Sequence, residues 1–193
     1  MATRETMADL IARLRSLIAD PAGDGATFTD DELEAILDQR RTEHRYRELM
    51  PMATFMPDGG VRFLQYAALE RRDWREGIAV GNGIGDWEEG AALYGPDMNQ
   101  IEPATGDLRL GRWTFAEHQP APVTIVGATY DLYAAAADAL ERWAARLKGD
   151  CDVRAGDFAM DRSDRIRHLL DLAATMRRRA RPTTGLLTRS DAC

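Results

Sequence analysis

The chain has few of the side chains from which catalytic and metal sites are usually built. Its 193 residues include two cysteines, Cys151 and Cys193, and three histidines. Two cysteines in a chain of this length do not form a disulfide framework, so we expect reduced thiols in a cytoplasmic protein. No serine lies in a Gly-x-Ser-x-Gly nucleophile motif; the serines are Ser16, Ser163 and Ser190. A small hydrolase is therefore the weakest of three functional hypotheses.

Long apolar runs are also missing from the sequence. No run of about 18 apolar residues is present, so no membrane span is expected. Residues 1–20 alternate charged and apolar residues as an amphipathic helix does, and they lack the apolar core of a signal peptide. Lysine occurs once, at Lys148, so nearly every cation is an arginine. The net charge of −7 argues against a general nucleic-acid binder.

The charges are divided unevenly along the chain. Residues 1–140 carry 13 basic and 24 acidic side chains, whereas residues 141–193 carry 12 and 8, so the two parts have net charges of −11 and +4. The basic residues concentrate in Arg162–Arg181. Arg177–Arg179 fall in the last turn of a predicted helix, where the helix dipole favours cations. The functional alternative is an electrostatic contact with an acidic protein or with DNA phosphates.

The longest predicted helix covers residues 130–147, and Thr129 is its expected N-cap. No glycine or proline interrupts it, and its apolar residues recur at three- and four-residue spacing. The apolar face comprises Tyr130, Tyr133, Ala134, Ala137, Leu140, Ala144 and Leu147. Ala135 and Ala139 lie beside this face, where small side chains let another backbone approach closely. We therefore expect this helix to have packing partners on more than one side.

Three shorter or weaker patterns predict further helices. Residues 7–19 form the first, and Arg15 is expected on its solvent-exposed face. Residues 29–41 form the second, which begins with a capping box made by Thr29 and Glu32. The last helix covers residues 162–180. Its predicted buried stripe consists of Ile166, Leu169, Leu170, Ala173 and Met176.

The middle of the chain has a different pattern. The pattern of residues 44–69 predicts a strand, a turn and a second strand. The glycine-rich segment 77–95 predicts an irregular loop. Residues 108–115 and 122–126 predict two more strands. The predicted fold class is mainly α, a bundle of about four helices with a β-rich insertion between the second and third. The predicted domains are a helical core of residues 1–43 and 128–182, the insertion 44–127 and the tail 183–193.

No constellation of residues predicts a catalytic, metal or cofactor site. The histidines His44, His118 and His168 have no partner at a recurring metal-binding spacing and are expected to be solvated. Gly81–Gly85 is neither a dinucleotide fingerprint nor a phosphate loop, so we expect a flexible loop. An acidic cluster follows the long helix and consists of Asp150, Asp152, Asp157 and Asp161. Carboxylates are as frequent as this on ordinary acidic surfaces, so the cluster does not predict a metal site.

The order of these parts resembles the head–tail connector (adaptor, head-completion) proteins of tailed bacteriophages and related gene transfer agents. A helix pair with Phe28-Thr-Asp-Asp-Glu-Leu33 opens the chain, Tyr130–Ala145 forms its centre, and Arg165–Ala180 closes the helical core before a tail ending in Leu187–Asp191. The resemblance covers residues 7–41 and 128–191. The smallest members are nearly all helical, so residues 44–127 depart from them.

The resemblance implies a structural role without enzymatic activity or cofactor. Such proteins form a ring, commonly of twelve subunits, beneath the portal; the ring extends the DNA channel and docks the tail or stopper protein. Genomic DNA then passes without sequence-specific binding, and the protein resides in the virion after assembly in the host cytoplasm. By analogy, the expected portal contacts are Arg177, Arg178, Arg181, Leu186, Leu187 and Arg189. The expected contacts between ring subunits are Tyr130, Tyr133, Ala135, Ala139 and Trp143. A DNA-binding or regulatory protein that uses the arginine-rich last helix is the alternative.

Overall fold

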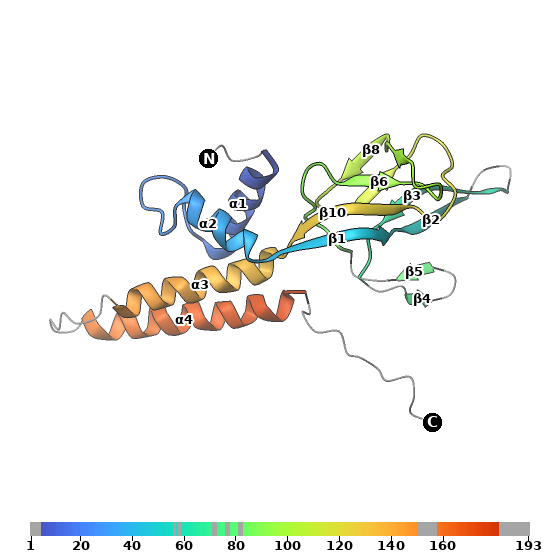
Figure 1. The fold of residues 1–193 in the computed structure, drawn as a ribbon. Coiled ribbons are helices and arrows are strands. Elements are labelled where there is room, and N and C mark those ends of the chain that lie inside the picture. Colours follow the sequence, from blue (N-terminus) through green and yellow to red (C-terminus); the bar gives the residue numbers. More distant parts are fainter. Residues whose placement is uncertain are drawn as a thin grey trace, which may run out of the picture. The chain divides into compact units, whose positions relative to one another are not determined.

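A computed structural model describes residues 5–55, 57, 59–70, 73–75, 78–80, 83–149 and 158–181 (Figure 1). Over these described residues the fold is a mixed α/β fold with four helices and two four-stranded antiparallel sheets. The prediction of a mainly α bundle is therefore wrong. The prediction fails because the strands between Arg41 and Tyr130 form a buried hydrophobic core of their own. They are not an insertion that packs on a helical core.

The helices and strands alternate in blocks along the chain. The helices are α1 (Glu5–Ile18), α2 (Asp30–Asp38), α3 (Leu132–Gly149) and α4 (Phe158–Arg179). The strands are β1 (Arg41–Glu48), β2 (Met50–Phe55), β3 (Val61–Ala67), β4 (Asp73–Arg75), β5 (Ile78–Val80), β6 (Ala92–Tyr94), β7 (Gln100–Ile101), β8 (Thr105–Asp107), β9 (Arg112–Thr114) and β10 (Thr124–Tyr130). The predicted helices are confirmed to within a few residues at each end. None of the described helices combines the length and apolar character that crossing a membrane requires.

The described residues fold as two compact units. One, the strand-rich unit, draws on Met1–Ile11 and Leu37–Tyr130, and the other, the helical unit, draws on Ala12–Ile36 and Asp131–Cys193. Each unit has its own set of internal contacts.

The strand-rich unit contains two sheets that share one core. Their strand orders are β1-β10-β6-β7 and β2-β3-β9-β8, and β4 and β5 form a separate pair. Both sheets contribute to the core, whose buried members are Leu49, Tyr66, Ala68, Ile84, Trp87, Leu93, Trp113, Phe115, Val123 and Ile125. Trp87 and Trp113 meet edge to face at 5.7 Å, which suits the quadrupoles of two buried rings.

The glycine-rich segment packs closely against another backbone segment near Gly85 and Gly111. A Cβ atom at Gly85 would overlap the carbonyl oxygen of Arg109, and one at Gly111 would overlap that of Ile84. Gly111 also has a φ of +64°, in the left-handed region that favours glycine. The irregular-loop prediction for residues 77–95 is confirmed for residues 83–91, which belong to no helix or named strand, and is wrong for β5 and β6.

The helical unit is organised around a buried arginine. Arg15, which the sequence pattern places on the wet side of its helix, is 7% exposed. Its Nη1 donates to Asp20 Oδ2 at 2.7 Å, and its Nη2 donates to Asp30 Oδ1 at 2.7 Å and to the carbonyl of Phe28 at 2.8 Å. A buried charge needs such partners, and these hold the turn between α1 and α2.

The sequence predicts an N-terminal cap for α2 and another for α3, and the structure confirms only the first. The capping box is confirmed, since Thr29 N donates to Glu32 Oε2 at 2.9 Å and Glu32 N donates to Thr29 Oγ1 at 3.2 Å. Thr129 is not the cap of α3, because it lies in β10 and is fully buried. Asp131 has that role, accepting a hydrogen bond from Ala134 N at 3.0 Å.

Replacing Gly111 by alanine tests the close packing of the strand-rich unit. Gly111→Ala should lower the free energy of unfolding by about 3 kcal/mol, because it adds left-handed strain to a backbone overlap. Gly90→Ala is the matched control: its φ is +91°, but its Cβ would meet nothing within 4 Å. Urea denaturation of both variants measures the difference, and equal losses would contradict the packing argument.

Acid should selectively weaken the contact made by Glu32. The hydrogen bond from the Thr29 amide lowers the pKa of Glu32 below its ordinary 4.5, and the hydrogen bond from Arg146 is the second cause. The stability that its ionised form provides is therefore present above pH 4.5 and is lost as the pH falls further. Urea denaturation should show Glu32→Gln to be about 0.5–1 kcal/mol less stable than the wild type at pH 7. The gap should shrink toward pH 3, and Glu34→Gln on the same helix is the control.

Candidate interaction surface

The α3–α4 hairpin is closed by the carboxylate of Asp131. In Figure 1 the two helices lie side by side and run antiparallel. One oxygen of Asp131 caps the start of α3 at Ala134 N, and the other accepts a hydrogen bond from Arg181 N at 2.7 Å, just past the end of α4. A single side chain thus fixes the first residue of one helix to the end of the other.

Arg177 adds a second link between the same helices. Its Nε and Nη2 donate to the two carboxylate oxygens of Glu141 at 3.0 and 2.7 Å, and its Nη2 also reaches Asp138 Oδ1 at 3.1 Å. These hydrogen bonds, chiefly those to Glu141, raise the pKa of Arg177, so it stays charged. A two-pronged arginine–carboxylate contact fixes orientation better than a lysine would.

The end of α4, held by Asp131 and by Arg177, therefore presents a cluster of arginines, here called the basic turn, which comprises Arg177, Arg178, Arg179 and Arg181. Arg177–Arg179 are exposed and Arg181 is half-buried. Arg178 Nη2 donates to Thr175 Oγ1 at 3.0 Å, one turn earlier. Because Asp138 and Glu141 offset Arg177, most of the uncompensated charge at this end belongs to Arg178 and Arg179.

The structure brings three of the six expected portal contacts together in the basic turn. Arg177, Arg178 and Arg181 lie within five residues of one another at the end of α4. Leu186, Leu187 and Arg189 lie outside the described residues. One predicted stripe residue, Leu170, is wrong as a buried position, because it is 47% exposed while its neighbour Leu169 is buried.

The five residues expected to contact ring neighbours have different surroundings. Tyr130 is buried and belongs to β10, and Ala135 and Ala139 are fully buried within their own chain. Tyr133 is 37% exposed and Trp143 is half-buried. Of this set, Tyr133 and Trp143 present the most surface to another molecule.

Aromatic and cationic side chains pack around Trp143 in the helical unit. Phe28 meets its ring edge to face at 6.4 Å, and the guanidinium of Arg165 lies 5.6 Å from the ring centre. Arg146 lies 4.6 Å from the centre of the Phe28 ring and donates to Glu32 Oε1 at 2.5 Å. These contacts tie α3 to the loop before α2, while Arg142 and Arg146 on the charged side of α3 remain exposed.

The histidines have mainly structural partners. His44 is half-buried, 3.0 Å from Thr129 Oγ1, with its ring 4.9 Å from that of Trp87. His118 Nδ1 accepts a hydrogen bond from Phe63 N at 3.0 Å. The expectation of a solvated side chain is therefore wrong for His44, while His168 is exposed as expected. Within the described part of the chain, no three His, Cys, Asp or Glu residues are grouped to hold a metal ion.

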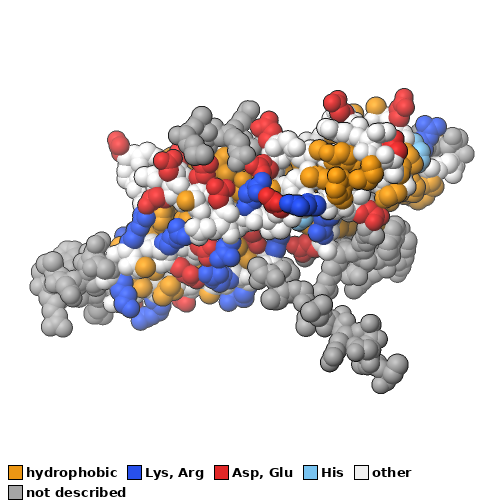
Figure 2. Space-filling view, in the orientation of Figure 1, with side chains coloured by type: hydrophobic (Ala, Val, Ile, Leu, Met, Phe, Trp, Pro, Cys, Tyr) orange, Lys and Arg blue, Asp and Glu red, His pale blue; other side chains and the backbone are white. Residues whose placement is uncertain are grey.

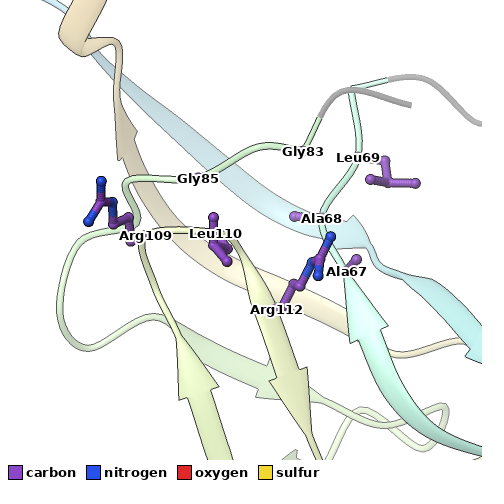
Figure 3. Close-up of a pocket in the computed structure, with 8 residues that line it drawn as sticks. All are labelled: Ala67, Ala68, Leu69, Gly83, Gly85, Arg109, Leu110 and Arg112. Carbon is purple, nitrogen blue, oxygen red and sulfur yellow. The ribbon is translucent and has the colours of Figure 1, made fainter. Parts of the chain in front are cut away.

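A hollow of about 260 Å³ lies beside the glycine-rich segment (Figure 3). Figure 3 shows the side chain of Arg112 beside Ala67 and Ala68, whereas that of Arg109 points away from the other labelled residues. The lining residues are Ala67, Ala68, Leu69, Gly83, Gly85, Arg109, Leu110 and Arg112. This described lining supplies backbone and aliphatic surface with two arginines, and neither a nucleophile nor a general base.

The strand-rich unit has an exposed apolar surface that the sequence pattern does not predict. Figure 2 shows hydrophobic side chains gathered over this unit. The large exposed members are Tyr46, Met52, Phe55, Val61, Met98 and Leu110. Alternation along strands cannot distinguish a face that packs on a core from one that projects beyond it, so the pattern alone carries no signal for this surface.

Removing the guanidinium of Arg177 should loosen the hairpin. Arg177→Gln should lower the free energy of unfolding by about 1 kcal/mol, the range for a well-oriented but exposed ion pair. Arg179→Gln is the matched control, because the described residues provide Arg179 with no partner. Thermal unfolding monitored by circular dichroism measures both, and a loss in Arg179→Gln equal to that in Arg177→Gln would contradict the link.

Comparison of the chain with protein-family models, with curated proteins and with solved structures found no match. Its function is therefore inferred from its own residues and from the resemblance described above.

Proposed function

We propose that this chain is a structural head–tail connector, or adaptor, of a tailed bacteriophage or a related gene transfer agent. In this role it forms a ring, of twelve subunits by analogy, beneath the portal. The ring extends the DNA channel and docks the tail or stopper protein. The role involves no catalysis and no cofactor.

The observation that carries the proposal is the basic turn, held rigidly at the end of the α3–α4 hairpin. In the connector proteins that the sequence resembles, the closing helix and the tail reach the portal. Here Asp131 and Arg177 fix the end of α4 in place. Preorganised charges lose less conformational entropy on binding than flexible ones do, so such a turn suits a lasting contact with an acidic protein surface.

The distribution of charge is consistent with a channel protein. Residues 1–140 carry a net charge of −11. A surface of that sign repels phosphates and lets DNA slide without being retained. The proposal therefore gives the acidic part and the basic turn different tasks, passage of DNA and attachment to the portal.

A DNA-binding or regulatory role remains the second candidate, because Arg178 and Arg179 are exposed. This role would require several phosphate contacts from one small cluster. Asp138 and Glu141 already offset Arg177, which lowers the number of cations that phosphates could recruit. The geometry therefore favours a protein partner over nucleic acid.

Charge reversal in the basic turn tests the portal contact. The double variant Arg178→Glu, Arg181→Glu should bind the portal protein of the same virus at least about tenfold more weakly than the wild type, since like charges then face each other. Arg181 keeps its backbone hydrogen bond to Asp131 in this variant. Biolayer interferometry with immobilised portal measures the change.

The matched control reverses two arginines of the strand-rich unit, Arg109→Glu and Arg112→Glu, which are both exposed. It makes the same change in net charge, so equal losses in both variants would indicate a general charge effect and contradict the assignment. Fluorescence anisotropy with duplex DNA at about 50 and 200 mM salt separates the second candidate, whose affinity must fall steeply over this range. Tight, salt-dependent DNA binding without portal binding would overturn the connector proposal.

A further inference from the structure

The strand β3 of the strand-rich unit has two differently built edges. Along one edge it pairs with β2 from Val61 to Ala67. Along the other edge, β9 pairs with it from Gln65 to Ala67. Backbone groups that stay open at the edge of a sheet can pair with another molecule. The part of this edge from Val61 to Leu64 therefore needs partners other than β9.

The segment that follows β9, residues 115–119, supplies most of these partners. Phe115 N donates to the carbonyl of Leu64 at 2.8 Å, and Gln119 N donates to the carbonyl of Phe63 at 3.1 Å. The hydroxyl of Tyr66 donates to the carbonyl of Gln119 at 2.8 Å. Because Tyr66 is fully buried, this last hydrogen bond ties the segment to the core of the unit.

The amide of Phe63 differs from these groups, because its partner is a side chain. Phe63 N donates to Nδ1 of His118 at 3.0 Å, and the two rings lie 5.8 Å apart. A backbone amide can only donate, so Nδ1 must be unprotonated and the proton of the neutral ring lies on Nε2. His118 thus takes the place of the carbonyl oxygen that a neighbouring strand would supply.

Proton uptake by His118 is incompatible with this hydrogen bond. A protonated imidazole carries a hydrogen on both nitrogens, so Nδ1 and the amide of Phe63 would be two donors facing each other. The charged residues next to the contact are Arg62 on β3 and Glu117 in the segment itself, and both are exposed. His118 forms no ion pair with a carboxylate of the described residues, so none of them holds the protonated ring in place.

We propose that His118 is a pH-sensitive closure of the β3 edge. In its neutral form it caps the amide of Phe63 and helps to keep residues 115–119 on the sheet. Protonation removes the cap and loosens this part of the edge, while the ladder between β3 and β9 stays closed. Histidine is the side chain that ordinarily changes charge between about pH 5 and 8, so the opening belongs to that range.

This inference does not depend on the connector role. His118 and Phe63 belong to the strand-rich unit, whereas the basic turn belongs to the helical unit. Loss of portal binding on reversal of Arg178 and Arg181 would leave the closure untouched. Conversely, an edge that ignores pH would leave the portal contact in place, so the two proposals fail independently.

NMR on the full chain labelled with nitrogen-15 can observe the hydrogen bond directly. An N–H···N hydrogen bond carries a scalar coupling between its two nitrogens. The amide nitrogen of Phe63 should therefore couple to Nδ1 of His118 at about pH 7.5 and lose the coupling at about pH 5, where histidine is ordinarily protonated. Absence of the coupling at the higher pH, or its persistence at the lower pH, overturns the proposal.

Amide hydrogen exchange measures what this bond does for the edge. The protection factor of Phe63 should fall about tenfold from about pH 7.5 to about pH 5, as expected for the loss of one hydrogen bond. That of Phe115, whose acceptor is a backbone carbonyl, should stay the same.

Two variants separate the closure from a general effect of acid. His118→Gln should abolish the pH dependence at Phe63, because a side-chain amide oxygen accepts a hydrogen bond and does not titrate. His168→Gln, at an exposed histidine of α4, is the matched control and should retain the pH dependence. An equal fall in His118→Gln and the wild type, or no fall in the wild type, overturns the proposal.

Discussion

The carboxylate of Asp131 is the interaction on which the candidate surface depends. One oxygen supplies the cap that α3 needs, because the first amides of a helix have no partner within it. The other oxygen binds the amide of Arg181, beyond the end of α4. The antiparallel hairpin is thus closed at the end where the arginines gather. Arg177 continues this closure along the helices, since it spans from α4 to two carboxylates of α3.

Buried polar groups and forced close approaches constrain the rest of the fold in a similar way. Arg15 can be buried only because Asp20, Asp30 and the carbonyl of Phe28 surround its guanidinium. In the strand-rich unit, Gly85 and Gly111 let backbone segments touch where a Cβ atom would overlap a carbonyl oxygen. These sites tolerate few alternatives, whereas the apolar positions around them accept side chains of similar volume.

Local signals in the sequence were reliable where the physics is local. The capping box of Thr29 and Glu32 and the approximate extents of the four described helices follow from neighbours within a few residues. The fold class did not follow, because the pairing of β1 with β10 joins segments about eighty residues apart and leaves no local trace. Arg15 was misplaced for the same reason: its partners lie beyond the turn that follows its helix. The cap of α3 was misplaced by two residues, since β10 runs on to Tyr130 before the helix begins.

The formal charge of a sequence segment also differs from the charge that remains once its ion pairs in the structure are counted. This difference affects which partner the basic turn suits. Residues 141–193 carry a formal charge of +4, which taken alone suits a nucleic-acid contact. In the structure Arg177 faces Asp138 and Glu141, and Arg146 faces Glu32, so parts of this charge are offset by residues outside or at the edge of the basic segment. The field that remains comes from the few arginines of the basic turn, which stand on a helix end held by Asp131 and Arg177. Nucleic-acid affinity grows with the number of phosphates neutralised, whereas recognition of a protein surface depends on the position of each charge. A small set of cations on a fixed helix end therefore supports the proposed protein partner more than a DNA duplex.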